Sequence, residues 1–229
     1  EFIIPFNNDG GIGKNYGFSG KIINASINLT KEFSIKNLTT EINHEIEDGE
    51  NIFDVIIKKG SIYDLELEDS AINLKRKNKE TKIKSLIRTN GKLNLVQIKK
   101  ITSLFNINID DIKDLNGIVD LKTNINFKLD KRLKFRNLSY KVEGEIPYIE
   151  IFIQEKKIIK KYLPEFNEKI IFKDSKIKLI DSKSNNTSEF KGFIKINDHF
   201  DEIKVKNIYN YNEKKFDING ILDLTNSKV

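Results

Sequence analysis

Long runs of alternating apolar and polar residues constrain the fold of this chain more than any other feature. Between Val119 and Leu129, apolar residues and Thr123 hold every odd position, whereas Asp, Lys and Asn hold every even position. Successive side chains of a strand point to opposite faces of its sheet, so the run predicts a strand with one apolar face. Residues 133–146 repeat the pattern after a turn at Asp130-Lys131, which predicts a long antiparallel pair.

The same period of two recurs along most of the chain. It predicts further strands over 23–29, 38–46, 53–57, 63–67, 72–74, 83–89, 170–180, 189–197, 202–209 and 216–224. Turn-forming residues predict turns at 47–49, 69–70, 77–79, 182–186, 197–198 and 212–213. One segment differs: residues 93–105 place Val96, Ile101, Leu104 and Phe105 at helical spacing. A second helical turn at 158–163 would stop at Pro164.

One short helix cannot cover the apolar faces of a dozen strands. A second sheet, the curl of the sheet itself, or a molecule outside the chain must cover them. We therefore predict an all-β fold, a long curled antiparallel sheet that is groove-like and open or partly closed, with one short helix near 93–105. We treat residues 1–229 as one domain. Because the chain begins at Glu1 and contains no Met, we expect it to be a fragment of a longer protein whose anchor lies elsewhere.

Composition excludes several classes of function. The absence of Cys excludes disulfides, thiol nucleophiles and zinc ribbons, and only two His are present. The 40 Lys and Arg residues outnumber the 34 Asp and Glu residues. However, the cations alternate with acids along the chain instead of clustering as on nucleic-acid-binding surfaces. Heavy use of Lys, Asn and Ile is typical of an AT-rich genome, and we expect no nucleic-acid partner.

Four short motifs that could carry chemistry have simpler interpretations. Residues 10–14 (GGIGK) lack the spacing of a phosphate-binding loop and indicate a turn. His44 and His199 have nearby carboxylates but no second His at ligand spacing, which favours surface histidines. The acids at 110, 111 and 114 lack the Gly and terminal Glu of a Ca²⁺ loop.

A catalytic centre is not expected either. The Gly-x-Ser-x-Gly pattern of a nucleophile elbow is absent, and Glu66 and Glu68 share the polar face of a predicted strand. We expect no enzyme activity, no cofactor and no metal.

From Gly60 onward, the pattern of glycines and alternating apolar residues resembles a known family. The matching segments are GSIYDLELEDS at 60–70, a strand ending in Gly91, the short helix, LNGIVDL at 115–121, VEG at 142–144 and FDINGILDL at 216–224. In this order they resemble the AsmA-like superfamily, specifically its YhdP-type members in Gram-negative envelopes. The strong Lys and Asn content and the lack of Trp and Met depart from that family. Residues 1–59 lie outside the resemblance.

The resemblance implies a bridge-like lipid transfer protein. Such a protein is anchored in the inner membrane, crosses the periplasm, and carries phospholipids toward the outer membrane in an apolar groove. The resemblance also implies outer-membrane components as partners. Acyl chains can replace a protein core, at about 0.8 kcal/mol per buried CH₂. The parity of the strands predicts the residues that line the groove: Val119, Leu121, Ile125, Phe127, Leu129, Leu138, Tyr140, Val142, Ile146, Phe216, Ile218, Leu222 and Leu224.

Two other interpretations are open. The apolar stripes could form the dry core of a closed β-sandwich, which would be a structural or interaction module of the envelope that assembles through its sheet edges. Alternatively, the Lys-rich surface could bind anionic lipid headgroups or lipopolysaccharide peripherally. Salt would separate the last interpretation from a groove, because screening weakens headgroup attraction but not apolar burial.

Overall fold

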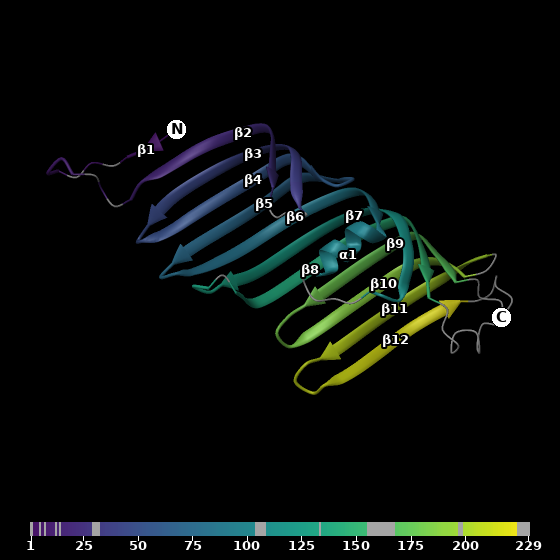
Figure 1. Ribbon diagram of the computed structural model, residues 1–229. Coiled ribbons are helices and arrows are strands. Elements are labelled where there is room, and N and C mark those ends of the chain that lie inside the picture. The colour runs from purple at the N-terminus through teal and green to yellow at the C-terminus, as the bar shows by residue number, and fades with distance from the viewer. Residues whose placement is uncertain are drawn as a thin grey trace. The chain divides into compact units, whose positions relative to one another are not determined.

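A computed structural model describes most of the chain. The described residues are 2–4, 6, 8–11, 13, 15–28, 33–103, 109–132, 134–154, 168–196 and 199–223. Within them the chain forms twelve strands and one helix (Figure 1). These are β1 (Phe2–Ile3), β2 (Gly17–Asn28), β3 (Ser34–Glu47), β4 (Glu50–Ile62), β5 (Leu65–Lys77), β6 (Glu80–Asn94), α1 (Leu95–Ser103), β7 (Ile112–Leu129), β8 (Phe135–Ile153), β9 (Lys169–Asp181), β10 (Asn185–Lys195), β11 (Phe200–Asn210) and β12 (Lys215–Asp223).

The strands form one sheet in which each strand is hydrogen-bonded to its neighbours in the sequence, from β1 to β12. The registered pairs are antiparallel, as expected for strands joined by short turns. The order has two ends, so the sheet is open. An all-β fold with one antiparallel sheet and one short helix is therefore confirmed.

Contacts divide the chain into two compact units. Unit 1 comprises Glu1–Thr89 and Lys122–Lys141, and unit 2 comprises Asn90–Leu121 and Val142–Val229. Unit 1 thus holds β1–β5, most of β6, the second half of β7 and the start of β8. Unit 2 holds α1, the first half of β7, the rest of β8 and β9–β12.

The apolar face of unit 1 follows from the strand register. Ile42 lies opposite Val55, and Val55 lies opposite Ile72, so β3, β4 and β5 present these side chains on one face. Four residues of this face form a buried cluster, with exposed fractions between 2% and 8%: Ile35, Leu38, Ile57 and Leu67. Burial of such side chains contributes about 1.5–3 kcal/mol each.

Residues with positive φ angles interrupt the regular geometry of three strands of unit 1. Asn24 in β2, Asn37 in β3 and Asp69 in β5 have positive φ angles of 53°, 51° and 40°. The pairing of β2 with β3 and of β3 with β4 shifts register close to Asn24 and Asn37. Bulged strands bend and twist more strongly, so these residues curl the sheet of this unit locally.

The turn predicted at Asp69-Ser70 is wrong. Strand β5 continues through these residues, and the preceding turn lies at Tyr63-Asp64. Ser70 is completely buried, and its hydroxyl donates to the Glu68 carbonyl (3.0 Å) and accepts from the Arg88 N–H (2.9 Å). The Ser70 hydroxyl thus provides a hydrogen-bond partner for the Arg88 N–H inside the sheet, and the positive φ of Asp69 is an angle that turns also use.

The same arrangement occurs in β9 of unit 2. Asp174 has a φ of 47°, and the next residue, Ser175, is 1% exposed and donates to the Lys173 carbonyl (2.9 Å). The surrounding sequences also correspond, with LEDSAINL at 67–74 and FKDSKIKL at 172–179. An Asp-Ser pair between apolar residues therefore builds one local structure twice.

Helix α1 confirms the short helix expected near 93–105. Its start is fixed by a reciprocal cap, in which the Gln97 N–H donates to Asn94 Oδ1 (3.0 Å) and the Asn94 N–H donates to Gln97 Oε1 (2.9 Å). The predicted apolar stripe is only partly right: Ile101 is half-buried, but Val96 is 64% exposed. The expected positions 104, 105 and 158–163, and the predicted turn at 197–198, lie outside the described residues.

Candidate functional site

Unit 2 carries an apolar row across four neighbouring strands. Ile177 lies opposite Phe190, Phe190 lies opposite Val205, and Val205 lies opposite Gly220. Phe172 packs edge-on against Phe190 with the ring centroids 5.0 Å apart. Ile177, Phe190 and Val205 are only half-buried, so this row still presents apolar surface.

The apolar row continues onto β12, where the side chains are open. All nine residues of β12 are exposed, and Phe216, Ile218 and Leu222 expose 55%, 66% and 43% of their surfaces. Their register partners on β11 are Tyr209, Asn207 and Ile203, which places them on the same face as Val205. Of the predicted groove residues, these three are the most exposed, and Leu224 lies outside the described part of the chain.

The predicted residues on β7 and β8 are more enclosed. In unit 2, Val119 and Ile146 are 3% and 8% exposed, whereas Leu121 and Val142 are half-buried. In unit 1, the remaining predicted residues are all half-buried, and the Phe127 ring lies 4.9 Å from the exposed Phe135 ring. These half-buried residues are Ile125, Phe127, Leu129, Leu138 and Tyr140.

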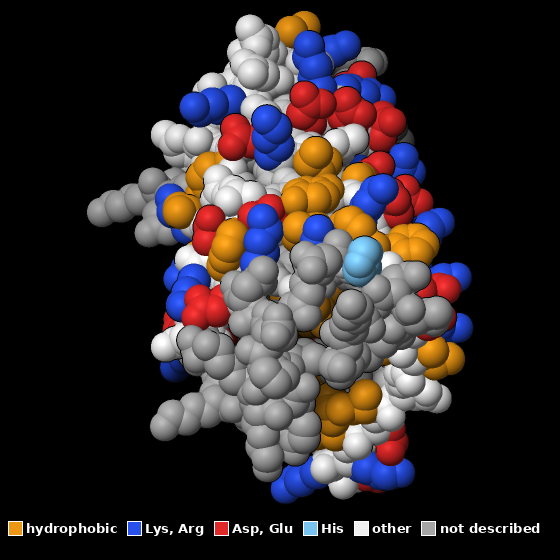
Figure 2. Space-filling model, turned by 90° about the vertical axis from the view of Figure 1, so that its right-hand side faces the viewer, with side chains coloured by type: hydrophobic (Ala, Val, Ile, Leu, Met, Phe, Trp, Pro, Cys, Tyr) orange, Lys and Arg blue, Asp and Glu red, His pale blue; other side chains and the backbone are white. Residues whose placement is uncertain are grey.

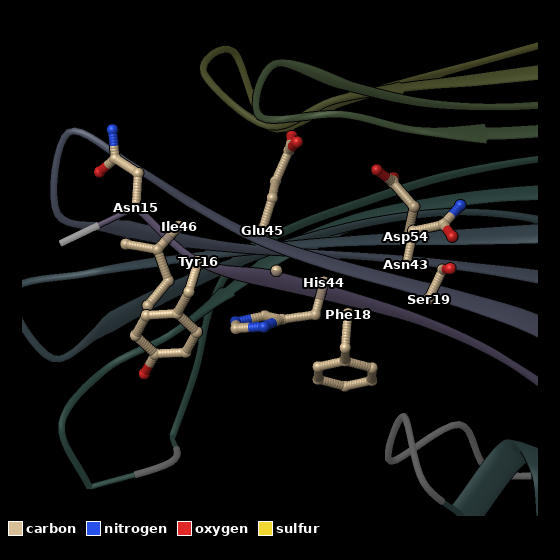
Figure 3. Close-up of a pocket in the computed structure, with 10 residues that line it drawn as sticks. Asn15, Tyr16, Phe18, Ser19, Asn43, His44, Glu45, Ile46 and Asp54 are labelled. Carbon is tan, nitrogen blue, oxygen red and sulfur yellow. The ribbon is translucent and has the colours of Figure 1, made fainter. Parts of the chain in front are cut away.

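An aromatic cluster lies where β2, β3 and β4 meet in unit 1. The His44 ring lies between Phe18 (5.1 Å) and Phe53 (4.3 Å), with Tyr16 at 6.1 Å. Figure 3 shows Tyr16, Phe18 and His44 on one side of the strands and Glu45, Asn43 and Asp54 on the other. Residues from both faces of these strands line a hollow of about 490 Å³, so it is an open surface feature and not an enclosed binding cavity.

His44 belongs to this cluster and not to a catalytic or metal site. It is 8% exposed, and Nε2 lies 3.3 Å from Asn51 Oδ1, whereas Nδ1 has no hydrogen-bond partner. The surface position predicted for His44 is therefore wrong, since alternation places it on the apolar face with Ile42 and Ile46. His199 is exposed, as predicted.

The opposite face of the sheet carries ion pairs. In unit 2, Lys206 Nζ lies 2.8 Å from Glu189 Oε1, and this hydrogen bond lowers the pKa of the Glu189 carboxyl. In unit 1, Lys21 and Lys58 lie 3.9 and 3.7 Å from Glu41. Figure 2 shows hydrophobic side chains in patches, with charged side chains of both signs around them. Exposed pairs of this kind add little stability, so they chiefly keep one face hydrated.

A polar network closes one end of the apolar face in unit 2. Tyr211 donates its hydroxyl to Asp181 Oδ1 (2.7 Å), and Asn186 Nδ2 donates to the same oxygen (3.2 Å). Further along, Asn207 Nδ2 donates to Ser188 Oγ (3.2 Å), while the buried Asn207 Oδ1 has no partner. The face thus changes from apolar to polar toward the turns that join β9 to β10 and β11 to β12.

The other short motifs do not form a chemical centre. Gly10 has a φ of 80° and Gly11 N–H donates to Asp9 Oδ1 (3.0 Å), which is turn geometry. Asp114 accepts from its neighbours Leu115 and Asn116. Across the described residues, no three His, Cys, Asp or Glu side chains gather in a way that could hold a metal ion. No described helix is long and apolar enough to cross a membrane.

Sequence reasoning missed two features of the molecule. It did not single out the buried cluster of unit 1, although Leu38, Leu67 and Ile57 each belong to a predicted strand. It also interpreted the cations as evenly spread, whereas the turns between β5 and β6 and between β7 and β8 bring five of them together. The signal was the local density of Lys and Arg at 75–79 and 131–136.

Comparisons with known proteins do not assign the chain to a family. No protein-family model, no curated protein and no solved structure matches the chain. The resemblance to the AsmA-like superfamily therefore stays a prediction from the sequence pattern.

Proposed function

We propose that the apolar face of the sheet binds the acyl chains of phospholipids and guides them along the protein without chemistry. The observation that supports this proposal is the exposure of one face of β12, where Phe216, Ile218 and Leu222 expose 43–66% of their surfaces. Large apolar side chains that gather on an exposed face are typical of a binding surface. A single open sheet leaves such a face accessible to a ligand.

The dimensions of the apolar row suit an acyl chain. Strands lie about 4.8 Å apart, so the row from Ile177 on β9 to β12 spans about 14 Å. The hydrocarbon core of a bilayer is about 30 Å thick, which gives about 15 Å for the chains of one leaflet. An acyl chain that crosses β9–β12 would contact Phe190 and Val205 over most of its length, and each buried CH₂ would contribute about 0.8 kcal/mol.

The polar end of the same face would limit the acyl-chain site along the direction of the strands. Asp181, Asn186 and Tyr211 hydrogen-bond there and keep that end hydrated. We further propose that the lipid is a glycerophospholipid in transit across the periplasm between inner and outer membranes, with the anchor in another part of the protein. This part of the proposal depends on the resemblance to YhdP-type proteins.

A matched pair of substitutions on β12 tests the proposal. Ile218 and Ile221 are 66% and 67% exposed, but they lie three residues apart and point to opposite faces. Ile218→Glu should lower the phospholipid that co-purifies with the protein at least about tenfold, since a buried Ile side chain contributes about 1.5–3 kcal/mol. Ile221→Glu should leave it unchanged. The measurement is native mass spectrometry with lipid extraction.

Two results would contradict the proposal. Equal losses in both variants would mean that any added charge on β12 disturbs binding, independently of the face. A folded, monodisperse wild-type protein without phospholipid would mean that the apolar faces are covered by protein. In that case the closed structural module would be the better interpretation.

A further inference from the structure

A basic pocket lies between two neighbouring turns of unit 1. The turn from β5 to β6 contributes Asn78, Lys79 and Glu80, and the connection from β7 to β8 contributes Asp130, Lys131, Arg132, Lys134 and Arg136. We call this hollow of about 480 Å³ the basic turn pocket. Lys128 Nζ lies 2.9 Å from Glu80 Oε1 and ties β7 to the start of β6 beside it.

Both carboxylates of the basic turn pocket are already neutralised. Asp130 Oδ1 accepts from the backbone N–H groups of Arg132 (2.9 Å) and Lys134 (3.0 Å), and Asp130 Oδ2 lies 3.3 Å from Arg136 Nη2. The backbone bonds from Lys134 and Arg132, followed by Arg136, hold the pKa of this carboxyl below its usual value. Glu80 is paired with Lys128. Asp130 thus shapes the loop and binds one cation, and neither acid is available to the others.

Four cations of the pocket are consequently left without a carboxylate. Lys79, Lys131, Arg132 and Lys134 are exposed and form no ion pair within 4.0 Å with any residue that the structure describes. On the outer face of β9–β11, Lys176, Lys191 and Lys206 each have a Glu partner at 2.8–3.9 Å, whereas Lys178 and Lys204 form no ion pair within 4.0 Å with a described residue. Four cations without a carboxylate partner therefore lie together at the two turns.

The backbone at Lys79 departs from the usual sequence of a hairpin turn. Asn78 and Lys79 have φ angles of 51° and 67°, which is a hairpin turn that normally takes Gly at its second position. The turn from β3 to β4 follows that preference, with Asp48 and Gly49 at 48° and 74°. A lysine is disfavoured in this conformation, but Lys214 adopts it as well (φ 52°), so the cations gathered at the turns, and not the strain, indicate a site.

We propose that the basic turn pocket binds a phosphate group, carried either by an anionic phospholipid headgroup or by free phosphate. Its eight lining residues are all polar or charged, so the pocket suits an anion and not an acyl chain. Arg132 can offer two parallel N–H donors to phosphate oxygens, and the lysines add point charges. The proposal depends on these charges alone and not on acyl-chain binding.

The test compares two double variants of the full chain. Lys79→Gly with Arg132→Gln removes two pocket cations, and the change to Gly also relieves the backbone of the turn. Lys214→Gly with Arg88→Gln is the matched control, because Lys214 also has a positive φ (52°) in a hairpin turn and lies outside the pocket. The probes are inorganic phosphate, followed by amide chemical shifts, and vesicles with equal parts phosphatidylglycerol and phosphatidylcholine, followed by co-sedimentation.

We expect inorganic phosphate to produce saturable shifts at Lys79, Arg132 and Lys134. The pocket variant should weaken this binding at least about tenfold, while the control changes it less than about twofold. Loss of vesicle binding in the same variant would identify a lipid headgroup as the ligand. Loss of phosphate binding alone would identify free phosphate. The absence of saturable shifts in the wild type, or equal weakening in the control, would overturn the proposal. Thermal unfolding should show that the pocket variant is at least as stable as the wild type.

Discussion

Ser70 shows how much one side chain contributes to a bulged strand. It has no exposed surface, and its hydroxyl accepts from the Arg88 N–H and donates to the Glu68 carbonyl. Ser70→Ala leaves the N–H without a partner, and we expect the free energy of unfolding to fall by about 1–3 kcal/mol. Ser175→Ala should cost less, because one hydrogen bond is lost there. Ser26→Ala, on an exposed position of β2, is the control in urea unfolding; equal values for all three variants would contradict this role for Ser70.

The bulges also mark the limit of what the sequence of each element could predict. The period of two located the strands, because a strand that buries one face must alternate apolar and polar residues. It could not decide between a turn and a bulge at Asp69-Ser70, since both use positive φ and only the partner strand distinguishes them. Helix α1 was readable from its spacing, and the pair Asn94 and Gln97 was an additional capping signal. The exposure of Val96 depends on packing that no local pattern contains. At the bulge of β9, Gly192 on β10 lies against Ser175, and an added Cβ would fall on the Ser175 hydroxyl and within 2.7 Å of its Cα. Gly192→Ala should therefore lower the free energy of unfolding by about 1–3 kcal/mol. Gly20→Ala is the control, because nothing lies within 4 Å of its added Cβ, and it should be neutral or slightly stabilising. Similar losses of unfolding free energy in both variants, measured by urea unfolding, would show that the close approach of Gly192 to Ser175 does not stabilise the bulge.

At the scale of the whole molecule, the two proposed sites differ in the force that holds the ligand, and salt should separate them. Acyl chains on the apolar face would be held by burial, which salt does not weaken. Phosphate in the basic turn pocket would be held by exposed charges, and the screening length falls from about 10 Å at 0.1 M salt to about 3 Å at 1 M. We therefore expect co-purified phospholipid to survive washing at about 1 M salt, while phosphate binding falls at least about tenfold. Ile218→Glu should remove the first and spare the second, and Lys79→Gly with Arg132→Gln should do the reverse. If lipid and phosphate are instead lost together as salt rises, charge attraction at the surface holds both ligands, and the apolar face is not the lipid site.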